Sequence, residues 1–166
     1  YATLELTAAG ERDDALEGLA RYCAGEVSLA LEGLVGPAQV EWLDRVREDL
    51  ESYRVALTWL VERGRLTEAS HIAWGLLWFW VIRGHAIEGL RWYEEILSRP
   101  PLPPGVESRV LNGAAVMRYM QGDFDRARTN VSRALTLAEG SGDTDAAVHA
   151  EWILGFVEHA VGNLDA

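Results

Sequence analysis

Histidine, cysteine and carboxylate side chains are the residues in this sequence that could perform catalysis or bind a metal. The densest group contains His149, Glu151, Glu158 and His159, which lie within eleven residues. His149 and Glu151 are two positions apart, and that spacing places them on different faces of a helix. The sequence has no HExxH or CxxC spacing. We therefore predict no metal site.

Nucleophilic and nucleotide chemistry are equally poorly supported. Cys23 lies in the helical string RYCAGE without a nearby histidine, so we interpret it as a small, semi-buried apolar side chain. Serine, histidine and aspartate are scattered, and no nucleophile elbow is present. All 15 cationic residues are arginines, and the absence of lysine excludes a P-loop and Schiff-base chemistry. We expect no enzymatic activity and no cofactor.

Composition restricts the partners and the compartment. The 166 residues carry a net charge of −11, which would repel a phosphate backbone, so we expect no nucleic-acid binding through this segment. The longest apolar run, Ile72 to Ile82, is about half of a membrane span. A lone cysteine cannot form an internal disulfide, and we expect a cytoplasmic protein. The sequence lacks an initiator methionine, and we expect it to be part of a larger protein.

Proline and glycine placement predicts an all-α fold. Four of the five prolines fall in Pro100–Pro104, and no valine, isoleucine or threonine run alternates with period two. Glycines follow apolar-periodic stretches where a helix end needs positive φ, at Gly64, Gly84, Gly122 and Gly162. Asp123 and Asp143 are expected N-caps. The predicted helices cover residues 12–34, 38–62, 66–83, 86–98, 106–121, 124–139 and 144–161, and another begins near 163.

The turn glycines recur with a repeat-like period. Gly84 and Gly122 are 38 residues apart, and Gly122 and Gly162 are 40 apart. Self-similarity at such a period indicates a helical repeat array. We expect non-repeat or capping helices in residues 1–62 and helical hairpin repeats in residues 63–166, with the last repeat truncated. Together they would form one continuous solenoid.

The unit LNGAAVMRYMQGDFDRARTNVSRALTLAEGSGD resembles a tetratricopeptide repeat (TPR). The family pattern requires an apolar residue, a pair of small residues, a Gly-Asp-aromatic sequence and small residues in the second helix. This unit has them at Leu111, Ala114, Ala115, Gly122, Asp123, Phe124, Ala127 and Ala134. The usual aromatic of the first helix is replaced by Arg118, and the usual late proline by Glu139. The resemblance implies a TPR-like superhelix of antiparallel helical hairpins.

A second resemblance covers more of the chain. Residues 36–97 are similar to the region that follows the ATPase module in bacterial STAND-type transcriptional regulators, which are LuxR-type or antibiotic-regulator-like and sometimes cyclase-fused. The matching elements are Gly36-Pro37, Trp42-Leu43, Arg45, Trp59, Glu62-Arg63-Gly64, Trp78-Phe79-Trp80, Arg83-Gly84 and Glu88-Gly89-Leu90-Arg91-Trp92. The resemblance implies a nucleotide-binding switch upstream that responds to the repeats.

Stacking the helices that end at Gly84, Gly122 and Gly162 aligns equivalent positions in rows. Within each helix the aligned positions are three, four and three residues apart, so they lie on one helix face. The first helix of each hairpin lines the concave side of a solenoid. We predict a concave recognition face of His71, Trp74, Arg109, Asn112, Tyr119, His149, Trp152, Phe156 and His159. The alternative is that these tryptophans pack between hairpins, and for Trp78 and Trp80 burial is favoured.

The sequence therefore favours a non-catalytic interaction or sensor segment of a signalling or transcriptional regulator. Its partner would be a protein or peptide, including the protein's own upstream ATPase domain, or a small effector. The alternative is a structural oligomerisation scaffold that self-associates through the Trp-rich face, and a homo-oligomer stays open.

Overall fold

The computed structural model describes the backbone of residues 2–99 and 101–162, with side chains from Gly10 onward. Every regular element in these residues is an α-helix, and no strand occurs among them. The prediction of an all-α fold is confirmed, and the arrangement is consistent with a helical-repeat protein. By their internal packing the helices fall into two compact units, residues 1–76 and residues 77–166.

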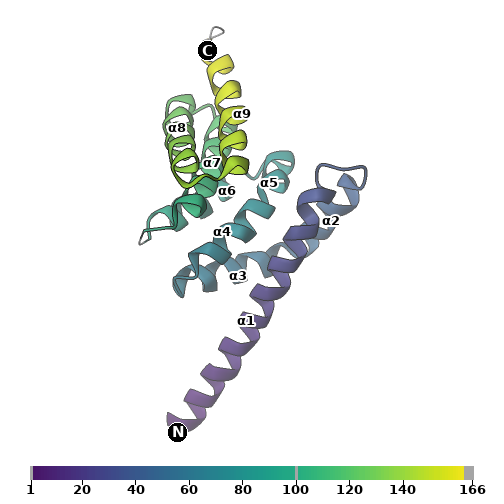
Figure 1. Cartoon of the computed structure of the whole chain (residues 1–166). Helices are drawn as coiled ribbons and strands as arrows, with labels where there is room; N and C mark the ends of the chain where they lie inside the picture. The colour runs from purple at the N-terminus through teal and green to yellow at the C-terminus, as the bar shows by residue number, and fades with distance from the viewer. Residues whose placement is uncertain (1, 100, 163–166) are drawn as a thin grey trace. The chain divides into compact units, whose positions relative to one another are not determined.

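The first unit contains four of the helices (Figure 1). They are α1 (Ala2–Gly33), α2 (Gln39–Glu48), α3 (Leu50–Glu62) and α4 (Leu66–Gly75). The core forms where α1, α3 and α4 meet, around Val27, Leu57 and Ile72, which are fully buried. At Gly75 a β-carbon would lie only 3.0 Å from Cγ2 of Val27, so α4 approaches α1 more closely than an alanine would allow.

The second unit contains the remaining helices of the described chain. They are α5 (Leu77–Arg83), α6 (Ala86–Leu97), α7 (Pro104–Met120), α8 (Phe124–Ser141) and α9 (Thr144–Ala160). Helices α7, α8 and α9 lie side by side (Figure 1). Their shared core consists of small and aliphatic residues: Leu111, Ala115, Ala127, Val131, Ala134, Ala150, Ile153 and Val157.

A second cluster of the same unit is aromatic. Trp80 is fully buried, and its ring meets the ring of Tyr93 edge to face, with centroids 5.8 Å apart. Two glycines let the neighbouring helices approach these rings. A β-carbon on Gly89 would lie 2.7 Å from the Trp80 ring, and one on Gly113 would lie 2.6 Å from the phenol oxygen of Tyr93. Small residues at helix crossings therefore make room for the large rings.

The four glycines predicted to follow helix ends, and the two predicted N-caps, are confirmed. Gly64, Gly84, Gly122 and Gly162 have φ of 70°, 74°, 78° and 82°, in the left-handed region that glycine adopts without strain. Asp123 accepts a hydrogen bond from the backbone N–H of Arg126 (3.4 Å), and Asp143 accepts one from that of Ala146 (3.0 Å). Both aspartates are thus the N-caps that the sequence predicted.

Three helix boundaries differ from the prediction. The expected helix 38–62 is interrupted at Asp49, whose carboxylate accepts a hydrogen bond from the hydroxyl of Tyr22 on α1 (3.1 Å). The expected helix 66–83 ends at Gly75 and resumes at Leu77. Helix α1 begins at Ala2 rather than at residue 12. The helix expected near residue 163 lies outside the described residues.

Two further expectations concern organisation. The compact units divide after Leu76, whereas the sequence prediction starts the repeats at residue 63. Compactness and repeat similarity are different criteria, so the predicted division stays a prediction. Among the described residues, no helix combines the length and the apolar character that a bilayer span requires.

Candidate functional site

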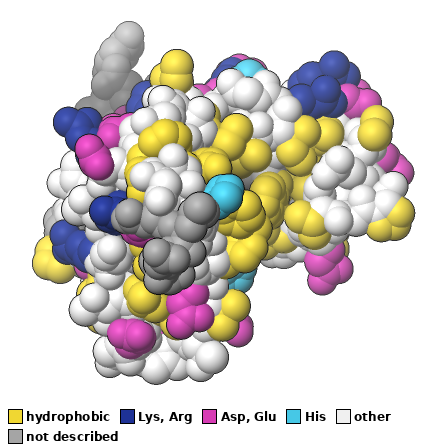
Figure 2. Space-filling model, turned by 90° about the horizontal axis from the view of Figure 1, so that it is seen from above, with side chains coloured by type: hydrophobic (Ala, Val, Ile, Leu, Met, Phe, Trp, Pro, Cys, Tyr) yellow, Lys and Arg dark blue, Asp and Glu magenta, His cyan; other side chains and the backbone are white. Residues whose placement is uncertain are grey.

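The second unit exposes a group of aromatic side chains, Trp78, Tyr119, Trp152 and Phe156, which we call the aromatic surface. Trp152 is 51% exposed and Phe156 is 45% exposed, although both are large apolar rings. Figure 2 likewise shows hydrophobic side chains gathered on an open face of the molecule. Large apolar rings left on a surface mark a binding region more often than isolated aliphatic side chains do.

Helix geometry places these rings. Trp152 and Phe156 are four residues apart on α9, so they lie one above the other on the same face. The opposite face of α9 carries Ala150, Ile153 and Val157, which are buried in the core with α7 and α8. Because that core fixes the rotation of α9, Trp152 and Phe156 are held on the outer side of the helix.

The rings form a chain of edge-to-face contacts. The centroids of Trp152 and Phe156 are 4.6 Å apart with an interplanar angle of 75°. Trp78 meets Trp152 at 6.2 Å and 65°, and Tyr119 meets Phe156 at 6.4 Å and 69°. These distances fall in the range in which aromatic pairs attract one another. The aromatic surface is therefore an ordered array rather than a set of independent side chains.

A small cavity opens between these rings. Its volume is about 160 Å³, and every side chain that lines it is hydrophobic or aromatic. The lining residues are Trp78, Val81, Val116, Tyr119, Met120, Trp152, Ile153 and Phe156. They come from α5, α7 and α9, the helices that the glycine period aligns. The cavity could hold one or two apolar side chains of a partner.

The predicted face is only partly open. Trp152, Phe156 and Tyr119 are brought together in the aromatic surface. Asn112 is 1% exposed, and its amide nitrogen donates to the carbonyl oxygen of Ala146 (3.2 Å), so it joins α7 to α9. Arg109 is half-buried on α7. Both residues lie outside the cavity lining.

The histidines of the predicted face do not gather around the cavity. His149 and His159 are exposed on α9. Nδ1 of His149 donates to the carbonyl oxygen of Asp145, one turn earlier (2.7 Å). Nε2 of His71, in the first unit, lies 3.2 Å from the carbonyl oxygen of Ala24 and 3.1 Å from the hydroxyl of Ser28. His71 thus packs against α1, and Trp74, also on α4, is half-buried.

The two tryptophans expected to be buried behave differently. Trp80 is fully buried, as predicted, whereas Trp78 is half-buried and lines the cavity. The prediction of burial was therefore wrong in part for Trp78. Its position in the row with Val116 and Phe156 was the signal that could have identified it. Met120 and Ile153 were missed, and the four-residue spacing from Val116 to Met120 was the available signal.

Two arginines near these helices form ion pairs. Arg118 forms ion pairs with Glu94 (2.6 Å) and Asp123 (3.1 Å), and Arg128 pairs with Glu158. Both arginines therefore connect helices within the second unit. Since their charges are neutralised by these acids, the aromatic surface is suited to apolar rather than ionic recognition.

Metal-ligating and thiol groups of the described residues lie outside the aromatic surface. Among them, no cluster of three or more His, Cys, Asp or Glu side chains could hold a metal ion. Cys23 is fully buried, and burial raises its pKa to about 11. Its thiol stays protonated at neutral pH and is a poor nucleophile. The aromatic surface and its cavity are lined by side chains that can bind apolar groups.

Comparison with known proteins gives one distant similarity. The chain is similar to three proteins named "Putative HTH-type transcriptional regulator", one from Mycobacterium bovis and two from different strains of Mycobacterium tuberculosis. Each is 30% identical over 115 residues, which cover 64% of this chain and 13% of the relative. The chain thus corresponds to a small part of the length of these relatives.

The other comparisons add no relatives. No protein-family model matches the chain, and no solved structure matches it.

Proposed function

We propose that this chain is a non-catalytic interaction segment of a transcriptional regulator, and that its aromatic surface binds an apolar segment of a partner protein. The observation that carries the proposal is the exposure of Trp152 and Phe156 beside a cavity lined by hydrophobic side chains. Rings of this size concentrate binding energy when a partner excludes water from them. The similarity to proteins named as putative transcriptional regulators supports the regulatory part of the proposal.

The mechanism that we propose is a coupling between binding and an upstream switch. The TPR-like character and the resemblance to STAND-type regulators favour a nucleotide-binding module upstream in the longer, cytoplasmic protein. Docking on α9 would alter how the repeats pack against that module. The occupant would be the module itself, another protein or peptide, or an effector. The segment would need no cofactor of its own.

A double substitution tests the binding surface directly. Trp152→Ala with Phe156→Ala removes both exposed rings, while Val148→Ala removes an exposed apolar side chain of α9 that lies outside the cavity lining. The fluorescence of the neutral apolar dye Nile red should be enhanced by the parent chain. This enhancement should fall severalfold in the double variant and persist in the Val148→Ala variant.

The same substitutions in the longer protein test the function. A transcription reporter should lose its regulated response with the double variant and keep it with Val148→Ala. Circular dichroism should show equal helicity for all three proteins, because the substituted side chains are exposed. An unchanged dye signal and an unchanged reporter response in the double variant would refute the proposal.

A structural scaffold is the second candidate, and the same exposed rings favour it. Two copies could cover Trp152 and Phe156 in a self-associating interface. Sedimentation velocity over a range of concentrations would then show a dimer that the double variant loses. A parent chain that sediments as a monomer throughout would eliminate this candidate.

A further inference from the structure

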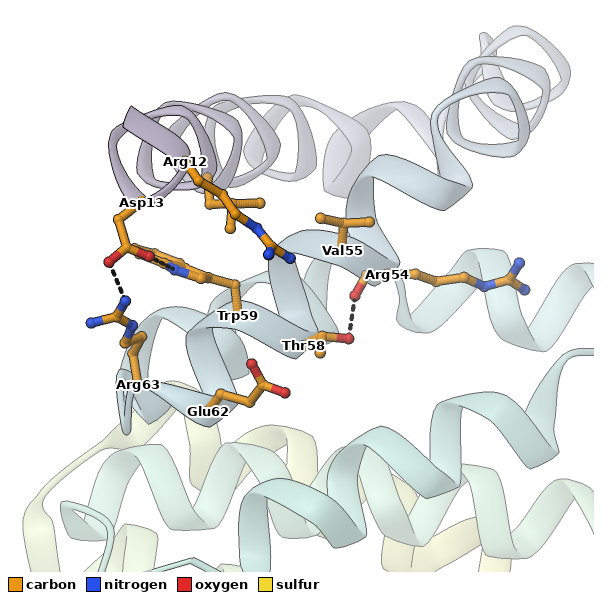
Figure 3. A pocket seen from close by; sticks show the side chains of 9 residues that line it. Arg12, Asp13, Arg54, Val55, Thr58, Trp59, Glu62 and Arg63 are labelled. Atoms are coloured by element: carbon orange, nitrogen blue, oxygen red, sulfur yellow. Dashed lines mark hydrogen bonds and ion pairs between the residues drawn. The ribbon is translucent and has the colours of Figure 1, made fainter. Parts of the chain in front are cut away.

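The first unit contains a larger cavity, between α1 and α3 (Figure 3). Its volume is about 760 Å³, within the range of pockets that bind small molecules. We call it the Arg12 pocket. Its lining residues are Arg12, Asp13, Leu16, Arg54, Val55, Thr58, Trp59, Glu62 and Arg63. None of them belongs to the predicted recognition face.

One wall of the Arg12 pocket is a positioned aromatic ring. The indole nitrogen of Trp59 donates to a carboxylate oxygen of Asp13 on α1 (3.4 Å). The guanidinium carbons of Arg65 and Arg63 lie 5.1 Å and 5.9 Å from the centroid of the Trp59 ring. Leu16 and Val55 add aliphatic surface. The apolar part of a ligand can therefore pack against the Trp59 ring, which these contacts already hold in one orientation.

Most charges of the pocket are engaged within the protein. Asp13 forms an ion pair with Arg63, and hydrogen bonds from Arg63 and Trp59 lower the pKa of its carboxyl group. Arg54 forms an ion pair with Glu51, and its guanidinium points away from the cavity in Figure 3. These groups therefore shape the pocket, and other residues must supply any charge for a ligand.

Arg12 and Glu62 are the remaining charged residues of the lining. Figure 3 shows the Arg12 side chain reaching from α1 toward α3. Neither Arg12 nor Glu62 makes a hydrogen bond or an ion pair with another residue in the part of the chain that the structure describes. Arg12 can thus receive an anion, and a guanidinium binds a carboxylate through two parallel hydrogen bonds. Glu62 would repel a second negative charge on the same ligand.

We propose that the Arg12 pocket binds a small organic monocarboxylate with an apolar body. The carboxylate is held by Arg12, and the apolar body packs on Trp59, Leu16 and Val55. Glu62 selects against dianions. This site is separate from the aromatic surface, and it does not depend on the function proposed for that surface.

Calorimetric titration of the whole chain with three probes tests the charge requirement. The probes are 3-phenylpropionate, its neutral amide 3-phenylpropionamide and the dianion 2-phenylsuccinate. The monocarboxylate should bind saturably at millimolar concentration and more tightly than the amide or the dianion. Equal affinity for the acid and the amide, or no saturable binding of the acid, would overturn the proposal.

Variants assign the effect to individual residues. Arg12→Gln should weaken binding of 3-phenylpropionate about tenfold or more, because it removes the charge and the paired hydrogen bonds that hold the carboxylate, and it should leave the amide unaffected. Arg47→Gln is the matched control, because Arg47 is an exposed arginine of the same unit outside the pocket. Glu62→Gln should improve binding of the dianion more than that of the monocarboxylate. An Arg12→Gln effect no larger than that of Arg47→Gln would refute the assignment.

Discussion

Replacing Gly113 with alanine probes the closest helix contact of the second unit. A β-carbon at Gly113 would lie 2.6 Å from the phenol oxygen of Tyr93 and nearer still to two of its ring carbons. Ordinary contacts between such atoms are about 3.5–4.0 Å, so the ring or the helix must move by roughly 1 Å. Tyr93 is fully buried and packs edge-on against Trp80, which leaves it little room to withdraw. Overpacking of this kind costs about 1–3 kcal/mol.

Gly155→Ala is the matched control for this substitution. Gly155 also lies inside a helix, α9, but a β-carbon there would meet no atom within 4 Å. Alanine in a helix interior is favoured over glycine by about 0.5–1 kcal/mol, and both variants receive this gain. The difference in unfolding free energy between the two variants therefore isolates the steric contact with Tyr93.

Urea unfolding followed by far-ultraviolet circular dichroism measures that difference. We expect Gly155→Ala to be slightly more stable than the parent chain, and Gly113→Ala to be about 1–3 kcal/mol less stable than Gly155→Ala. The near-ultraviolet signal should also change in Gly113→Ala, because the Trp80–Tyr93 pair is disturbed. Equal stability of the two variants would show that α6 and α7 do not approach as closely as described.

Two further predictions concern Cys23 and Asp143. Because burial raises the pKa of Cys23 to about 11, iodoacetamide at mildly alkaline pH should alkylate it much faster in urea than in the folded protein, and equal rates would contradict its burial. The folded protein favours the protonated thiol of Cys23, and this preference stabilises the fold fully at pH values below the ordinary thiol pKa of 9.0. The stabilisation is lost as pH rises through about 11. Asp143→Ala removes an N-cap, so it should lower the unfolding free energy measured in urea by about 1 kcal/mol. Asp145→Ala is the control: it removes an exposed carboxylate that makes no N-cap bond, and it should have a smaller effect.

Features that depend on neighbouring residues were predicted well from the sequence. The left-handed glycines and the aspartate N-caps are local, since each is fixed by the backbone within one or two turns. The helix break at Asp49 could not be predicted, because no glycine or proline marks it. Tyr22 reaches Asp49 from α1, 27 positions earlier, and that contact is visible only in the folded chain.

The candidate site was predictable where periodicity determines a face. The glycine period aligned Trp78, Val116 and Phe156, and these three residues line one cavity. Exposure was harder to predict, because it depends on what packs against each helix. Asn112 shares a row with Trp152, yet Asn112 is buried by the start of α9 and Trp152 is exposed. The Arg12 pocket could not be predicted, because its residues follow the ordinary four-residue spacing of a helix face on α1 and on α3, and only folding brings those two faces together.

The packing of α7 and α8, and of α8 and α9, has a consequence for how the second unit folds. Its main interfaces join helices that are consecutive in the chain, and each needs only a short loop to close. Such topologies fold rapidly, and their stability is distributed along the chain as a sum of neighbouring interfaces. Neighbouring interfaces can therefore open one at a time, so that α9 could detach from α8 while α6 and α7 stay paired. Occupation of the aromatic surface, much of which α9 carries, would then oppose that opening.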